Sequence, residues 1–281
     1  MGTLGLRAAS AGDVRRDGAA AAVALPDTRQ FDLTERGQLY RIQVAVPNVP
    51  APPEGFPVVV MVDGNALFAS AYATARLLSG RPQISGVGPA ILVGIGYPGD
   101  AVFDHERRRG DLLPENGGAD RFLSFLDETV LPAVAGHARL DRSHATLVGH
   151  SFGGLFALHA LFSRPGLFSA YVAGSPSIWW NDRAILGAED RFAPPSSVDR
   201  PRLLVVVGAE EQSAETERDP ARAERLRQAR MVDNAHELAQ RLTARGDVHC
   251  RYRALPGENH ISVVPTMLAR ALVFAHTGSC P

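Results

Sequence analysis

The stretch "LVGHSFGGLFALHALF", residues 147–162, joins an apolar run to a segment with helical spacing through the residues "GHSFG" at 149–153. Where a strand turns sharply into a helix, the residues two before and two after a central serine must be small, because backbone packs against backbone. Gly149 and Gly153 meet this requirement. The stretch therefore predicts a nucleophile elbow that presents the Ser151 hydroxyl at the carboxyl edge of a sheet. A glycine-rich turn with a helix-capping serine is the alternative, and it leaves Gly149 unexplained.

Strand-like and helix-like segments alternate on both sides of this turn. Strands are predicted at 39–47, 57–64, 90–98, 144–150, 168–176, 202–210 and 247–257, and helices at 66–79, 119–136, 153–163, 221–245 and 261–275. Several of the strands are apolar on both faces, as central parallel strands are. This order predicts an α/β fold of the α/β-hydrolase type. Its central sheet is expected to be mostly parallel, with helices on both faces and an antiparallel strand at 39–47.

The chain of 281 residues is predicted to form a single domain over residues 29–281, after a flexible N-terminal arm at 1–28. The segments 99–118 and 177–200 are expected to be long loops or an inserted cap over the strand ends. An Ala/Val run follows Arg15 and Arg16, but it is too short and too weakly apolar for a secretory signal or a bilayer span. We therefore expect a cytoplasmic protein, with export to the periplasm as the alternative.

Composition narrows the class of partner. The net charge is −1 and the pI is near 6.8, so no basic surface for nucleic acid or an anionic membrane is expected, and the partner is expected to be a small molecule. All 29 basic residues are arginine, which excludes lysine nucleophiles and Schiff bases. Cys250 and Cys280 stand apart from any metal-ligand spacing, although one disulfide is an option in an exported protein. Neither a metal nor a cofactor is expected.

A serine hydroxyl needs a histidine as base and an acid that orients this histidine. In this fold their order along the chain is serine, acid, histidine. Of nine histidines, His260 is the predicted base, because "LPGENHISVVP" places it in a loop between the last strand and the last helix. His150, beside the serine, is expected to point elsewhere. Glu211 follows the strand "LLVVVG" and is the predicted acid in preference to Glu210. Asp233 is a third candidate, and a serine–histidine pair without an ordered acid is another.

An oxyanion hole requires two backbone amides, one of them from the residue after the nucleophile. That residue is Phe152. The second amide is expected from the loop in "MVDGNALF", where Gly64 allows a sharp turn and Asn65 follows it. Asp63 is expected to hold this loop together.

These same residues carry a family resemblance. The segments "VVMVDGNALF", "GDAVFDHERRRGDLLP", "LVGHSFGGLFALHALFSRPGLFSAYVAGSPSIWW", "VGAEEQ" and "GENHISVVP" resemble the esterase-D-like α/β hydrolases that include the catecholate siderophore trilactone esterases acting on enterobactin and salmochelin. The resemblance covers about residues 29–275. It implies ester hydrolysis by Ser151 and His260, with Phe152 and Asn65 near the oxyanion. One departure is Ala209, where relatives often carry the acid.

The resemblance also implies a substrate-lining arginine in "RRRGDLLP", which corresponds to Arg108 or its neighbours Arg107 and Arg109. A ferric tris-catecholate is anionic and aromatic, so guanidinium groups and rings such as Trp179 and Trp180 suit it. The alternative for the arginines is a solvated face, and for the tryptophans a plug at the sheet edge. Other functions considered are a generic carboxylesterase or thioesterase such as S-formylglutathione hydrolase, an acyltransferase, and a non-catalytic binding protein.

Overall fold

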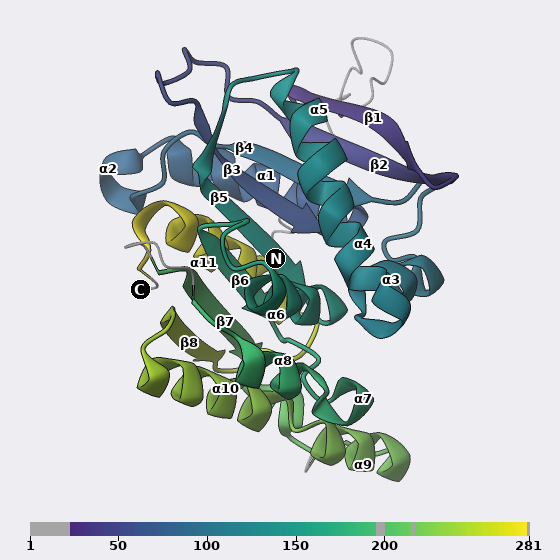
Figure 1. Ribbon diagram of the computed structural model, residues 1–281. Helices are drawn as coiled ribbons and strands as arrows, with labels where there is room; N and C mark the ends of the chain where they lie inside the picture. Colours follow the sequence, from purple (N-terminus) through teal and green to yellow (C-terminus); the bar gives the residue numbers. More distant parts are fainter. Residues whose placement is uncertain (1–22, 195–199, 215–216, 280–281) are drawn as a thin grey trace, which may run out of the picture.

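The computed structural model describes residues 23–194, 200–214 and 217–279, and its centre is one eight-stranded sheet in the order β1-β2-β4-β3-β5-β6-β7-β8 (Figure 1). The strands are β1 (Thr28–Glu35), β2 (Gln38–Ala45), β3 (Phe56–Val62), β4 (Ile91–Gly96), β5 (Leu140–His150), β6 (Ala170–Gly174), β7 (Arg202–Gly208) and β8 (His249–Leu255). β1 pairs with β2, and β2 with β4, in antiparallel orientation. From β4 onward, through β3, β5, β6, β7 and β8, each strand pairs parallel with the next in the sheet. The α/β prediction with an antiparallel start is confirmed.

Helices cover both faces of this sheet (Figure 1). One face packs against α1 (Gly64–Ser79) and α11 (Val263–Thr277). The other carries α4 (Gly118–Phe125), α5 (Leu131–Ala135), α6 (Phe152–Ser163), α8 (Ile185–Arg191) and α10 (Met231–Arg245). Shorter elements complete the fold: α2 (Pro82–Ser85), α3 (His105–Leu112), α7 (Trp180–Arg183), α9 (Pro220–Ala229), η1 (Glu115–Gly117), η2 (Leu126–Val130) and η3 (Ala209–Gln212). In the described part of the chain, no helix is both long and apolar enough to cross a membrane.

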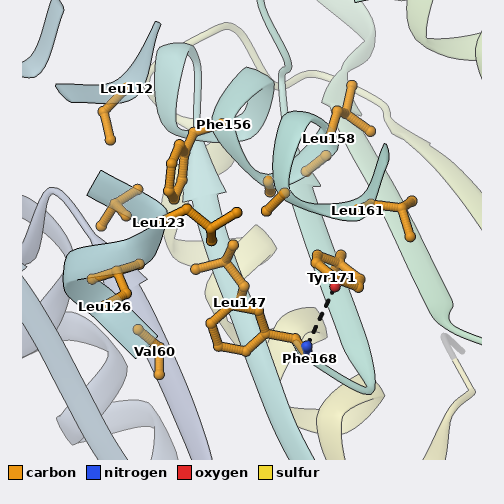
Figure 2. Close-up of a cluster of buried hydrophobic side chains, with 14 of the residues drawn as sticks. Val60, Leu112, Leu123, Leu126, Leu147, Phe156, Leu158, Leu161, Phe168 and Tyr171 are labelled. Atoms are coloured by element: carbon orange, nitrogen blue, oxygen red, sulfur yellow. Dashed lines mark hydrogen bonds between the residues drawn. The ribbon is translucent and has the colours of Figure 1, made fainter. Parts of the chain in front are cut away.

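The core explains why the central strands lack polar alternation. β4 and β6 are buried at every position, because helices cover both of their faces. Figure 2 shows the larger of two cores, where Leu147 of β5 and Phe156 of α6 lie among aliphatic side chains of α4 and η2. Each such fully buried side chain contributes about 1.5–3 kcal/mol of hydrophobic stabilisation. The Tyr171 hydroxyl stays satisfied in this core by donating to the Arg164 carbonyl at 3.1 Å.

The structure differs from the sequence predictions in several segments. Residues 23–28 of the predicted arm are part of the described structure: β1 starts at Thr28, and the Pro26 carbonyl accepts a 2.8 Å bond from Tyr72. The rest of the predicted arm, residues 1–22, lies outside the described residues, as does Cys280. The segments expected to be long loops or an inserted cap contain short helices: α3 lies within 99–118, and α7 and α8 lie within the described part of 177–200. The predicted helix at 221–245 is two helices, broken at Arg230 with φ 43°. The predicted helix at 119–136 contains the π turn η2.

Candidate active site

Ser151 lies at the turn between β5 and α6 in a strained backbone conformation, with φ 59° and ψ −115°. Such angles are rare for a residue with a side chain and cost of the order of 1–3 kcal/mol. Gly149 permits the turn, because a Cβ there would lie 2.1 Å from the Gly153 carbonyl oxygen. The Ser151 amide donates to the Gly174 carbonyl at 2.9 Å, which ties the turn to β6. This is the geometry that the "GHSFG" pattern predicts.

Two loops at the same sheet edge bring a histidine and a carboxylate to Ser151. His260 lies between β8 and α11, and its Nε2 is 3.1 Å from the Ser151 Oγ. Glu211 lies in η3, directly after β7, and its Oε2 is 2.6 Å from the His260 Nδ1. The carboxylate is buried, whereas 39% of the His260 side chain is exposed, so a substrate can reach the imidazole. Serine, imidazole and carboxylate thus form one hydrogen-bonded line.

The choice between the candidate acids is clear in the geometry. The second oxygen of Glu211, Oε1, accepts bonds from the Ser175 hydroxyl at 2.5 Å and the Gly208 amide at 2.6 Å. Glu210 instead accepts from Ser213 at an exposed position. Asp233 pairs with Gln212 and Arg230. Only Glu211 of the three candidates contacts His260.

His150 is a feature that sequence reasoning missed. Its ring is 3% exposed, and its centroid is 4.6 Å from that of His260. Burial lowers the pKa of His150 to about 3, and positive charge on His260 or Arg108 acts in the same direction. The sequence predicts that His150 points away from Ser151 and indicates no partner for it, whereas the structure packs its ring against that of His260, the predicted base. The position of His150 at the last residue of β5 was the available signal.

The two predicted oxyanion donors lie at the first turns of two helices. Phe152 is the first residue of α6, and Asn65 is the second of α1. Amides in a first helical turn have no intrahelical acceptor and are free for a ligand. The Asn65 side chain fixes its loop: Oδ1 accepts from the Tyr97 amide and Nδ2 donates to the Tyr97 carbonyl, both at 3.0 Å. Asp63, just before α1, takes the left-handed conformation with φ 55°.

The three consecutive arginines of α3 point in three directions, because each helical residue is rotated by about 100° from the last. Arg107 does not line the nucleophile. Its guanidinium lies 4.8 Å from the centre of the Tyr40 ring and 4.5 Å from that of Tyr97, and Nη1 donates to the Leu39 carbonyl at 2.6 Å. The expectation that Arg107 binds substrate therefore gives way to an anchoring contact between α3 and the sheet.

Arg108 also differs from the expectation of a free substrate-binding group. It is 6% exposed and forms a two-pronged ion pair with Asp63, in which Nε is 2.9 Å from Oδ1 and Nη2 is 2.8 Å from Oδ2. Both carboxylate oxygens are thus taken by one guanidinium. The reason is that α3, predicted as loop, turns this side chain inward toward the start of α1.

Comparison with known proteins shows the family of this chain. Residues 34–262 match the Esterase family model, described as "Putative esterase". The chain belongs to this esterase family. It is 33% identical to the ferri-bacillibactin esterase BesA of Bacillus subtilis, over 94% of each chain. It is 37% identical to the siderophore triacetylfusarinine C esterase of Aspergillus fumigatus, over 89% of this chain and 93% of that one. The crystal structure of the BES protein from Bacillus cereus superposes with a TM-score of 0.82 at 32% identity, covering 93% of this chain and 99% of that one.

In this esterase, the rings of Phe152, Trp180 and Trp179 form an aromatic wall that starts at the residue after Ser151. The Phe152 ring meets the Trp180 ring edge to face, with centroids 4.9 Å apart. The centroid of the Trp179 ring lies 5.7 Å from that of Trp180, and 38% of the surface of Trp179 is exposed. The exposed guanidinium of Arg109 lies 5.5 Å from the centre of the Trp180 ring. Glu115 accepts a hydrogen bond from the Trp180 indole. The predicted residues Arg109, Trp179 and Trp180 therefore lie together, and their link to the nucleophile turn is the contact of Trp180 with Phe152.

Two serines after β6 contact Glu211 and Ser151, and sequence reasoning singled out neither of them. Ser175 donates to Glu211, as described above. The Ser177 hydroxyl is buried and lies 3.4 Å from the Ser151 Oγ, while its amide donates to the Ser151 carbonyl at 3.2 Å. Among the residues that the structure describes, no cluster of three or more His, Cys, Asp or Glu could hold a metal ion.

Proposed function

We propose that this esterase hydrolyses the ester bonds of a siderophore through a serine nucleophile. The observation that carries the proposal is the hydrogen-bonded line from Glu211 through His260 to Ser151, with the serine held in a strained turn. Such a line is what acyl transfer needs, because a serine hydroxyl is a weak nucleophile until a base accepts its proton. Curated relatives of similar length are named for the siderophores ferri-bacillibactin and triacetylfusarinine C, which supports the same substrate class.

The residues would act in two half-reactions. The Ser151 Oγ attacks the ester carbonyl carbon and its proton passes to the His260 Nε2. The amides of Phe152 and Asn65 stabilise the negative oxygen of the tetrahedral intermediate. His260 then protonates the departing alcohol oxygen, which leaves an acyl group on the serine. Water repeats the sequence and releases the carboxylic acid, while Glu211 keeps the proton of the imidazole on Nδ1.

The aromatic wall supports an aromatic, anionic ester as substrate. Trp179 and Phe152 offer ring surfaces, and Arg109 adds a positive charge that faces solvent over Trp180. A ferric tris-catecholate carries both negative charge and rings, and guanidinium and aromatic groups recognise that combination. A catecholate trilactone therefore fits this wall better than a short neutral ester does.

A substrate panel tests the function. Ferric enterobactin, iron-free enterobactin and p-nitrophenyl acetate are supplied at equal ionic strength, and products are separated by chromatography. We expect a higher kcat/KM for the siderophore than for the simple ester, and loss of both activities in Ser151→Ala. A wild-type protein that cleaves only p-nitrophenyl acetate would refute the siderophore assignment. Retained turnover in Ser151→Ala would refute the nucleophile.

The contribution of Arg109 can be separated from general charge effects. A charged hydrogen bond contributes about 1.5–3 kcal/mol, so Arg109→Ala is expected to lower kcat/KM for ferric enterobactin by roughly ten- to a hundredfold. The neutral ester should change little. Arg36→Ala is the matched control, because Arg36 is a well-exposed arginine in the turn between β1 and β2. Equal effects of the two substitutions would contradict the substrate contact.

We also propose that the protein acts in the cytoplasm, where an imported iron complex would be opened. Cell fractionation with an antibody against the protein tests this location, and recovery with periplasmic markers would contradict it.

A further inference from the structure

The guanidinium of Arg108 lies in a dry site between two aromatic rings. Its central carbon is 5.1 Å from the centre of the Phe103 ring and 5.4 Å from that of Phe152. Asp63 takes the Nε and Nη2 donors, and Nη2 also lies 3.5 Å from the His150 carbonyl oxygen. Rings, carboxylate and carbonyl together hold this cation on several sides.

The two groups that Arg108 contacts precede the two amides of the oxyanion hole by the same interval. Asp63 stands two residues before Asn65, and His150 stands two residues before Phe152. The two segments also meet directly, since a Cβ on Gly153 would lie 3.3 Å from the Asp63 Oδ2. One guanidinium therefore bridges the start of α1 to the turn before α6.

We propose that Arg108 is a positioning residue that sets the separation of the Asn65 and Phe152 amides, so that both reach one oxyanion. This inference rests on the proposed serine mechanism and assigns Arg108 a role other than substrate binding. Its charge is already neutralised by Asp63, and its side chain is 7% exposed, so it has little to offer an anionic ligand. A planar fork that binds both carboxylate oxygens fixes distance and angle together, which a lysine cannot do.

The proposal predicts a particular kinetic pattern. In Arg108→Lys the charge remains but the fork is lost, so the amide at Asn65 shifts relative to that at Phe152. Loss of one oxyanion donor lowers kcat by about 10²–10³, and partial misplacement is expected to lower it by roughly ten- to a hundredfold. KM should change less than about threefold, because donors that act in the transition state are not used in ground-state binding. The kcat loss should be similar for p-nitrophenyl acetate and ferric enterobactin.

Asp63→Asn provides a second variant that keeps the shape of the pair. It is expected to show the same kcat loss, and the double variant Asp63→Asn/Arg108→Lys should lose less than the product of the two single losses. Glu189→Gln is the matched control. Glu189 is a buried carboxylate in α8 that pairs with Arg241 in the same two-pronged way, at 2.9 and 2.8 Å. It should lower the melting temperature and leave kcat unchanged.

A binding measurement separates positioning from substrate recognition. Tryptophan fluorescence titration with ferric enterobactin compares Ser151→Ala with Ser151→Ala/Arg108→Lys, and equal Kd values are expected. A Kd raised about tenfold or more, or a kcat/KM loss confined to the anionic ester, would overturn the proposal in favour of substrate binding. Unchanged kcat in both Arg108→Lys and Asp63→Asn, with Ser151→Ala inactive, would overturn it while the proposed function stands. A wild-type protein inactive on every ester would overturn both.

Discussion

Replacing Glu211 with glutamine is expected to trap His260 in the wrong tautomer. Oε1 of the acid accepts bonds from Ser175 and from the Gly208 amide, and the main-chain amide cannot become an acceptor. The glutamine carbonyl must therefore occupy this position, which turns its NH₂ group toward His260. At 2.6 Å from Nδ1 that NH₂ can only donate, so the imidazole must carry its proton on Nε2. A ring protonated there cannot accept the proton of Ser151.

The size of the effect follows from this geometry. Holding a catalytic imidazole in the wrong tautomer lowers kcat by about 10⁴, equivalent to about 5 kcal/mol of transition-state stabilisation. The assay is the steady-state kcat for p-nitrophenyl acetate, with thermal melting to show that the variant is folded. Glu210→Gln is the control, since its exposed carboxylate contacts Ser213 instead, and it should stay within about twofold of wild type. A folded Glu211→Gln protein within about tenfold of wild type would refute the reasoning and favour a serine–histidine pair.

Two further substitutions test the strained turn and the buried imidazole. Gly149→Ala places a methyl 2.1 Å from a main-chain oxygen, so purified protein should melt at a lower temperature and lose kcat. Gly110→Ala should do neither, because outside the local backbone of α3 no heavy atom lies within 4 Å of the new methyl. The second test concerns His150, whose pKa is about 3 in the folded protein and near 6.5 in the unfolded chain. Between pH 6.5 and pH 3 the unfolded chain therefore binds more protons than the folded protein, and the free energy of unfolding falls as the pH drops. Between pH 7 and pH 5 the wild-type free energy of unfolding, measured with urea, should fall by about 2 kcal/mol more than that of His150→Gln; equal losses would contradict the buried neutral state.

The elements that sequence reasoning found share one property, a long apolar run or a clear helical spacing. β1 lacks that property because it is an edge strand: half of its eight positions are exposed and none is fully buried. α3, "HERRRGDL", has no apolar stripe, because charged side chains occupy most of its positions, and two of its arginines, Arg107 and Arg108, bind partners that are distant in the chain. Its N-terminal cap, the Asp104 side chain bonded to the Arg107 amide at 3.1 Å, was the readable local signal. Both misses have one cause: contacts remote in the chain decide these segments.

The same distinction holds at the site. Ser151, His260 and Glu211 could be picked from the sequence because chain order and loop position after a strand constrain them. The pairing of Arg108 with Asp63 spans 45 residues and has no local signature. The contact between His150 and His260 likewise depends on how the end of β5 and the loop after β8 meet at the sheet edge.

The three arginine contacts of α3 depend on the length of this helix, which its composition does not reveal. One residue added or deleted inside α3, between its first residue His105 and Arg107, rotates the rest of the helix by about 100°, so each guanidinium would point where its neighbour now points. The sheet anchor, the bridge to Asp63 and the wall at Trp180 would be lost together, although every side chain is still present. Exchange of residues within α3 can remove one contact at a time, but a change of length cannot. Insertions compatible with activity therefore belong in the exposed turn at 98–100, before the helix begins and ahead of Ala101, whose carbonyl accepts a bond from the Asn65 side chain.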